Sequence, residues 1–166
     1  MKKIFFVIVF AFFALALNAQ IKSANLQASG LTCSMCSNSI FKSLKKVSFV
    51  ESVESDVEAS TFKIIFKSNE NVDPDALQKA VTDAGFSIAK LTFVLSINQV
   101  DLKEKTPIEI DQKLFYFINT QNKVLNGQIE LRLLDKGFVS PKEYKKIKSK
   151  LYSNGEKRVF NVDMNI

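Results

Sequence analysis

Two cysteines separated by two residues carry the clearest chemistry in this sequence. Cys33 and Cys36 are the only cysteines of the 166-residue chain, which contains no histidine and no tryptophan. A Cys-x-x-Cys pair can form a disulfide, act as a redox couple or bind a metal ion through two thiolates. The absence of histidine excludes hydrolases that use an imidazole base and the common zinc hydrolases. The sequence therefore points to thiol chemistry.

The place of the pair in the chain favours ionised sulfurs. Gly30 indicates a bend before the pair, and apolar residues at helical spacing predict a helix after it: Cys36, Ile40, Leu44 and Val47. The dipole and the free N–H groups of a helix N-terminus stabilise a thiolate. Thiol pKa values in such positions fall from ~8.5 to as low as ~3.5–7.5. We therefore expect both sulfurs to ionise at neutral pH and to converge on one ion.

The ligand set limits the choice of metal ion. Thiolates suit soft ions such as Cu(I), whereas structural zinc usually has four ligands. The segment around Cys33 and Cys36 contains no imidazole and no carboxylate. Two sulfurs alone fit an ion that accepts low coordination. We expect Cu(I), with Hg(II) or Zn(II) as alternatives.

The residues around the pair predict alternating strands and helices. Asp73 as N-cap, Pro74 in the first turn and Gly85 at the end mark a second helix. Strands are predicted at residues 21–29, 50–57, 61–66 and 91–97. The resulting order is β-α-β-β-α-β, which is the ferredoxin-like arrangement.

These features together resemble the heavy-metal-associated (HMA) domain family over about residues 22–95. The resemblance lies in the segment GLTCSMC at 30–36, the helix after it, the element order and Gly85-Phe86. The family's hallmark is a Gly-Met-Thr-Cys-x-x-Cys loop, and Leu31 stands here where that Met is usual. The resemblance implies metal ligation by Cys33 and Cys36, with Met35 directed outward and Phe86 packed beside the loop. It further implies partner proteins that donate or accept the metal through thiolates.

The remaining residues predict a second, smaller α+β region. Strands are expected at 114–119, 128–134 and 158–164, with a turn-rich stretch containing Asn122 and Asn126-Gly127 between the first two. Ser140 to Glu143 forms a capping box, so a helix is expected from there to Asn154-Gly155. The predicted class is α+β: a ferredoxin-like domain at 20–97 and a β-rich α+β region of unknown function at 98–166. Because no Pro- or Gly-rich linker separates them, we expect the halves to pack closely or to share a strand.

Residues 1–19 have the pattern of a secretory signal peptide. Lys2 and Lys3 precede an apolar run from 4 to 17, and small residues follow with cleavage expected after Ala16 or Ala19. The apolar run is shorter than the ~20 residues of a transmembrane helix. We therefore expect an exported protein, periplasmic or secreted, without a transmembrane helix in the mature chain.

Charge is distributed unevenly along the chain. Residues 20–95 have no net charge, whereas 96–166 contain 13 basic and nine acidic residues. The lysine-rich stretch 142–150 predicts a solvated helix face, or else a docking patch for an acidic partner or a membrane surface. We do not expect nucleic acid binding by an exported protein.

No catalytic motif is present, so we do not expect an enzyme. The favoured hypothesis is an exported soft-metal carrier or buffer. The first alternative is an adaptor protein of the cell envelope, in which the HMA-like part is a scaffold and residues 98–166 recognise a protein partner. The second is a thiol-redox protein.

Overall fold

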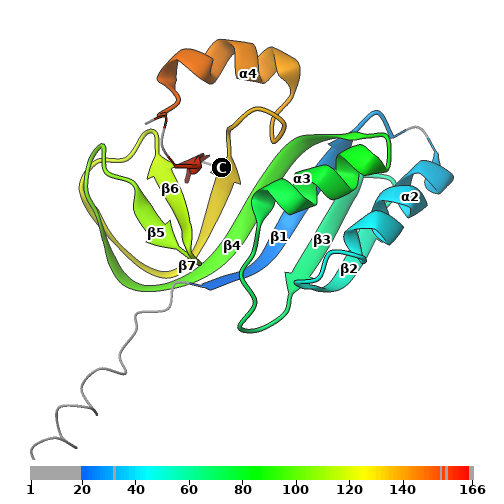
Figure 1. Ribbon diagram of the computed structural model, residues 1–166, viewed down its shortest axis with the longest axis horizontal. Coiled ribbons are helices and arrows are strands. Elements are labelled where there is room, and N and C mark those ends of the chain that lie inside the picture. The colour runs from blue at the N-terminus through cyan, green and yellow to red at the C-terminus, as the bar shows by residue number, and fades with distance from the viewer. Residues whose placement is uncertain (1–19, 32, 154, 156, 165–166) are drawn as a thin grey trace, which may run out of the picture.

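A single eight-stranded sheet runs through the molecule (Figure 1). The computed structural model describes residues 20–31, 33–153, 155 and 157–164, and the predicted signal peptide lies outside them. The strands are arranged in the order β2-β3-β1-β4-β7-β8-β6-β5. Helices α2 and α3 lie along the β2-β3-β1-β4 part of the sheet, and α4 lies beyond the other part. None of the helices among the described residues is long and apolar enough to cross a membrane.

The first half has the predicted β-α-β-β-α-β order. Its elements are β1 (Gln20–Ser29), α2 (Ser34–Leu44), β2 (Val50–Asp56), β3 (Thr61–Phe66), α3 (Pro74–Asp83) and β4 (Ser87–Leu102). All neighbouring strands in this half are antiparallel. The observed ends of the predicted elements differ from the expected ones by a few residues, except that β4 is longer at both ends.

The alternation of apolar and polar residues explains why the helices cover one face. Phe62, Ile64 and Phe66 on β3 point to the same side, and all three are buried. Ile40 and Leu44 of α2 are fully buried in the same hydrophobic core. The helices are therefore held on the sheet mainly by burial of apolar side chains, which contributes about 25 cal/mol per Å².

The second half extends the same sheet. Its elements are β5 (Ile108–Ile110), β6 (Lys113–Phe117), β7 (Lys123–Leu133), α4 (Pro141–Ile147), the 3-10 helix η2 (Lys148–Lys150) and β8 (Val159–Asp163). Strand β8 is inserted between β7 and β6, antiparallel to the first and parallel to the second. The last strand of the chain thus joins elements that precede it in sequence.

Helix α4 ends earlier than the sequence predicts. It stops at Ile147, well before Asn154-Gly155, of which Asn154 lies outside the described residues. After η2 the chain becomes extended at Leu151, and the backbone N–H of Tyr152 donates to Asn161 Oδ1 on β8 at 2.7 Å. This tertiary hydrogen bond holds the chain in an extended form where the local pattern predicted helix.

Strand β4 belongs to both halves. It is 16 residues long, and it pairs with β1 through residues 87–96 and with β7 through residues 92–102. Of the two arrangements expected, close packing or a shared strand, the structure therefore has the shared strand. The boundary predicted between residues 97 and 98 falls inside this strand.

The turn-rich stretch predicted between these strands is right at Asn122, which lies between β6 and β7, and wrong at Asn126-Gly127, because both residues lie inside β7. Ile97 is opposite Gly127 and Val100 is opposite Leu125, so two residues of β4 face one residue of β7. Gln99 has φ +45° and Gly127 has φ +89°. Residues that tolerate positive φ are typical of turns, but here they form a β-bulge.

Polar contacts also connect the two halves. Arg158 forms a two-pronged ion pair with Asp75 of α3, with N···O distances of 3.1 and 3.0 Å. Lys113 lies 3.7 Å from Asp73, and Asp111 accepts a hydrogen bond from the backbone N–H of Val72 at 3.0 Å. The N-terminal end of α3 is therefore fastened to the second half by three separate contacts.

Candidate metal centre

The cysteine pair lies where β1 passes into α2. Gly30 has φ +81°, a conformation that few other residues adopt, and it turns the chain away from the sheet. Leu31 is partly buried against the core and holds the loop to the protein. Just before the loop, the hydroxyl groups of Ser29 and Ser87 are 2.5 Å apart and link the end of β1 to the start of β4. The loop is thus anchored at its base.

Cys33 is the N-cap residue of α2. Its backbone is extended, and its Sγ accepts a hydrogen bond from the backbone N–H of Cys36 at 3.3 Å. Its carbonyl oxygen accepts from the N–H groups of Cys36 and Ser37, at 3.1 and 3.3 Å. The sulfur therefore occupies the position that a serine or aspartate oxygen takes in an ordinary N-cap. A negative charge on this sulfur is favoured by the positive end of the helix dipole.

Cys36 lies in the first turn of α2, so the structure brings the two cysteines together in the way that the sequence predicts. Both cysteines are free; Cys33 is exposed, and Cys36 is half-buried. The first turn of the helix contains no acidic residue, which would otherwise disfavour two thiolates. One sulfur is therefore open to an incoming partner while the other is partly covered by the protein.

The surroundings supply few other metal ligands. Among the described residues, no group of three or more Cys, Asp or Glu side chains is placed to hold a metal ion. The side chain of Met35 is 79% exposed. Phe86 is half-buried against the hydrophobic core. The donor set of the described loop thus consists of two sulfurs, which suits an ion of low coordination number.

Ser37 is a feature of this site that the sequence analysis did not single out. The residue is only 2% exposed, and its Oγ has no hydrogen-bond partner among the described residues. It follows Cys36 directly on the buried side of α2. The signal in the sequence was weak, because a serine next to a cysteine in a serine-rich helix start reads as a surface residue.

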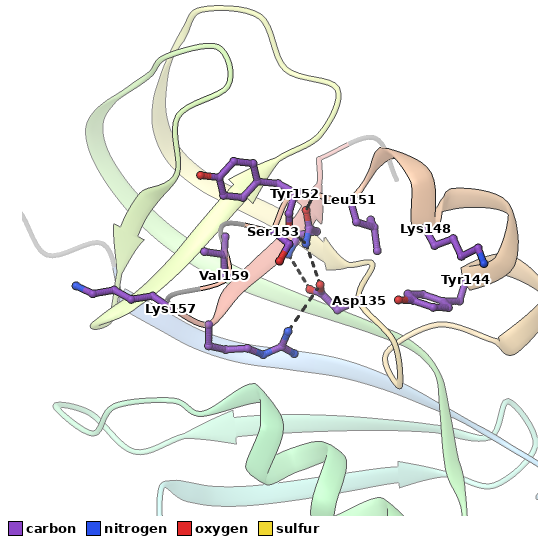
Figure 2. A pocket seen from close by; sticks show the side chains of 11 residues that line it. Asp135, Tyr144, Lys148, Leu151, Tyr152, Ser153, Lys157 and Val159 are labelled. Carbon is purple, nitrogen blue, oxygen red and sulfur yellow. Dashed lines mark hydrogen bonds and ion pairs between the residues drawn. The ribbon is translucent and has the colours of Figure 1, made fainter.

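A concavity lies in the second half, between the α4–η2 segment and β8 (Figure 2). It has a volume of about 550 Å³. The hydroxyl of Tyr144 points toward Asp135 across it, and Leu151 and Lys148 lie on the same side as Tyr144. Tyr144 and Leu151 are both half-buried.

The floor of this cavity is a closed polar cluster. Asp135 accepts hydrogen bonds from the backbone N–H and from Nδ2 of Asn161, at 2.7 and 2.9 Å, and lies 3.8 Å from Arg158. Burial raises the pKa of Asp135 above its ordinary value, and the hydrogen bonds from Asn161 and the charge of Arg158 oppose this rise. Because these polar groups are paired with one another, we interpret the cluster as structural. This cluster was not predicted from the sequence, although an Asp and an Asn within otherwise apolar strand sequences could have indicated it.

Residues 25–87 match the family model of the heavy-metal-associated domain. The resemblance seen in the sequence is thereby confirmed for this part of the chain. Solved structures that are similar to the chain include one described as "Crosstalk between Cu(I) and Zn(II) homeostasis", with 27% identity, 40% of this chain and 94% of that chain covered, and a TM-score of 0.37. The N-terminal domain of PacS from Synechocystis PCC6803 is 27% identical, with coverages of 40% and 92% and a TM-score of 0.35.

A third similar structure is a copper binding domain from HMA7, a P-type ATPase. It is 26% identical, with 41% of this chain and 93% of that chain covered and a TM-score of 0.37. No curated protein matches the chain.

Proposed function

We propose that the protein is an exported carrier or buffer for a soft metal ion, Cu(I), which it binds through Cys33 and Cys36. The observation that carries this proposal is the geometry of the loop: Cys33 Sγ accepts a hydrogen bond from the backbone N–H of Cys36 at the N-terminus of α2, and Cys36 lies in the first turn of the same helix. The match of residues 25–87 to the heavy-metal-associated domain supports metal binding as such. The choice of Cu(I) over Hg(II) or Zn(II) rests on the two-sulfur donor set.

Transfer of the ion would proceed by exchange of thiolates. Cys33 is exposed and Cys36 is half-buried, so a thiolate of the partner protein approaches most easily on the Cys33 side. The partner's sulfur binds while Cys33 leaves, and Cys36 then gives up the ion to a second sulfur. An ion that accepts two or three ligands passes through such an intermediate easily. The partner in this proposal is a protein with thiolate ligands that donates or accepts the metal.

Export would expose the two thiols to oxidation, because disulfides persist outside the cytosol. A metal ion bound to both sulfurs would protect them. The proposal therefore predicts that the metal-loaded protein reacts more slowly with thiol-modifying reagents than the metal-free, reduced protein. Measurement of the modification rate by mass spectrometry checks this.

The central experiment is an anaerobic Cu(I) titration of reduced residues 20–166 against a competing chelator. We expect one tightly bound Cu(I) per chain, and loss of that binding in the Cys33→Ser/Cys36→Ser variant. The matched control is Met35→Ala, which removes a soft sulfur from the same loop. Because this side chain is 79% exposed, the control is expected to bind Cu(I) with unchanged stoichiometry. Stoichiometric binding by the double serine variant would refute the proposal.

The thiol-redox alternative is tested with the same material. A disulfide reductase or oxidase turns over a substrate many times per cysteine pair, whereas a carrier does not. Catalytic reduction of a model disulfide by the wild type, abolished by the double serine variant, would favour the redox function instead.

A further inference from the structure

Five lysines on α4 and η2 form a strongly positive surface that the metal site does not use. They are Lys142, Lys145, Lys146, Lys148 and Lys150, and we call them the lysine face. All five are exposed, and none is in an ion pair with another described residue. Glu143 is the one acidic residue within 142–150, and its carboxylate is 2.8 Å from Arg132 on β7. The positive charge of the lysine face is therefore not balanced locally.

The opposite side of this segment is turned toward the protein. Tyr144, Ile147 and Leu151 are half-buried, and Ser140 caps the helix by accepting a hydrogen bond from the N–H of Glu143 at 3.2 Å. The Glu143–Arg132 pair fixes the segment to β7, and the cap holds the first turn of α4. Lys148 lines the cavity on the same side as Tyr144, whereas the other four lysines are exposed and do not line it.

The composition of the lysine face favours a diffuse anionic surface over a specific protein partner. Cores of protein–protein interfaces are enriched in aromatic residues and Arg and depleted in Lys. The exposed large apolar side chains of the described residues are Met35, Val57 and Val124, and none of them belongs to this segment. Lysine clusters without an apolar anchor are typical of electrostatic attraction to anionic lipid headgroups.

Topology places the metal loop at the same end of the sheet as the lysine face. Strand β1 is antiparallel to β4, and β4 is antiparallel to β7, so β1 and β7 run in the same direction. The loop with the cysteines follows the end of β1, and α4 follows the end of β7. In Figure 1 α4 lies at the top of the molecule and the N-terminal end of α2 at its right-hand edge, beyond the ends toward which β7 and β1 run.

We propose that the lysine face docks the mature protein on an anionic phospholipid bilayer, with the metal loop at the end of the molecule that faces the bilayer. The orientation deepens the proposed function, since it would present the metal ion to a recipient at the membrane. The docking itself requires only the lysine face and holds whether or not the cysteines bind metal. It also needs no penetration of the bilayer by the chain.

The experiment is co-sedimentation of residues 20–166 with vesicles of phosphatidylglycerol and phosphatidylcholine, compared with vesicles of phosphatidylcholine alone. Residues 1–19 are omitted because their apolar run would bind lipid by itself. We expect binding to the anionic vesicles at low salt, little binding to the neutral ones, and loss of binding at high salt. Absence of binding to the anionic vesicles at low salt would overturn the proposal.

Two triple variants that lose the same number of charges test whether vesicle binding depends on the lysine face or only on the net charge of the protein. Lys142→Gln/Lys145→Gln/Lys146→Gln removes three charges from α4, and Lys42→Gln/Lys45→Gln/Lys46→Gln removes three exposed charges from α2 and the residues just after it. Each lysine near an anionic surface strengthens binding by about fivefold, so the α4 variant is expected to bind on the order of 100-fold more weakly. The α2 variant is expected to bind within a few fold of the wild type. Equal weakening in both variants would overturn the proposal.

Two further control experiments test the folding of the variants and the independence of vesicle binding from metal binding. Circular dichroism establishes that each triple variant is folded, which is expected because all six lysines are exposed. The Cys33→Ser/Cys36→Ser variant is expected to bind anionic vesicles as the wild type does. Failure of Cu(I) binding and failure of membrane docking are therefore distinguishable results.

Discussion

Four residues at the start of α2 have very different environments, and this difference defines what each can do. Cys33 is exposed, Met35 is largely exposed and Cys36 is half-buried. Ser37 is buried, and within the described part of the chain its hydroxyl has no hydrogen-bond partner. The helix thus presents its sulfurs to solvent while it places an unsatisfied polar group in the core.

Replacement of Ser37 by alanine is expected to stabilise the metal-free protein. A buried hydroxyl without a partner lowers stability by about 1–3 kcal/mol, and alanine also has the higher helix propensity. We expect the free energy of unfolding of Ser37→Ala to rise by about 1 kcal/mol in urea titrations of the reduced protein. Ser39→Ala is the control, because its exposed hydroxyl donates to Met35 O at 3.1 Å. A loss of stability in Ser37→Ala would show that the hydroxyl has a partner.

Single elements differ from their predicted form where one tertiary contact outweighs the local pattern. Helix α4 is cut short by the hydrogen bond between Tyr152 and Asn161. Glu143, predicted to complete a capping box, instead pairs through its side chain with Arg132. Strand β7 continues through Asn126-Gly127 because a bulge absorbs the residues that would otherwise form a turn.

The bulge makes Gly127 sensitive to substitution although the space around it is open. Its φ of +89° is strained for a residue with a Cβ, and no atom lies within 4 Å of an added Cβ. The left-handed conformation is disfavoured by roughly 1–2 kcal/mol for such residues. We expect Gly127→Ala to lower the free energy of unfolding by about that amount, as measured by urea denaturation. Gly127→Asn should be less harmful, since Asn tolerates this conformation better. Equal stability of all three proteins would show that the bulge relaxes.

At the scale of the whole molecule, the two halves are one structural unit. They share β4, and Arg158 joins Asp75 of the first half to Asp135 of the second. The guanidinium of Arg158 also stacks over Phe160, 4.4 Å from the ring centre. We therefore expect removal of the second half to lower the stability of the first half.

Truncation after residue 97 is expected to destabilise the metal-binding half. It removes β7 from the side of β4 and leaves Asp75 without its partner Arg158. It also uncovers apolar residues of β4 and creates a free sheet edge, which promotes aggregation. We expect residues 20–97 to unfold at a lower temperature than residues 20–166 in calorimetry. An unchanged Tm would show that the first half folds independently of the second.

The buried Asp135 is expected to make stability depend on pH. Its pKa in the folded protein is raised by burial, so the folded state retains a proton that the unfolded state has already lost. Stability therefore falls as pH rises from the unfolded pKa of 3.8 through the folded one. The advantage of the wild type over Asp135→Asn is expected to shrink across this window in unfolding experiments at several pH values. An advantage that grows with pH would mean that Asn161 and Arg158 outweigh burial.

Much of the first half could be predicted because its signals are local. Asp73 and Pro74 begin α3 where the capping pattern indicated, and Phe62, Ile64 and Phe66 alternate as a half-buried strand must. The second half was harder, because a turn signal such as Asn-Gly is equally compatible with a bulge. The register between β4 and β7 decides between the two, and register is a property of two segments far apart in the chain.

By itself the sequence determined the cysteine pair, its place before a helix and the β-α-β-β-α-β order around it. Those features depend on residue types and on spacings of a few residues, because helix capping and hydrophobic periodicity act between neighbours in the chain. Only the tertiary structure decided that β4 serves both halves, that β8 enters between β7 and β6, and that the lysine face lies at the same end of the sheet as the metal loop. These features arise from pairing between distant segments, where the burial of side chains from both partners selects one arrangement among many with the same local pattern.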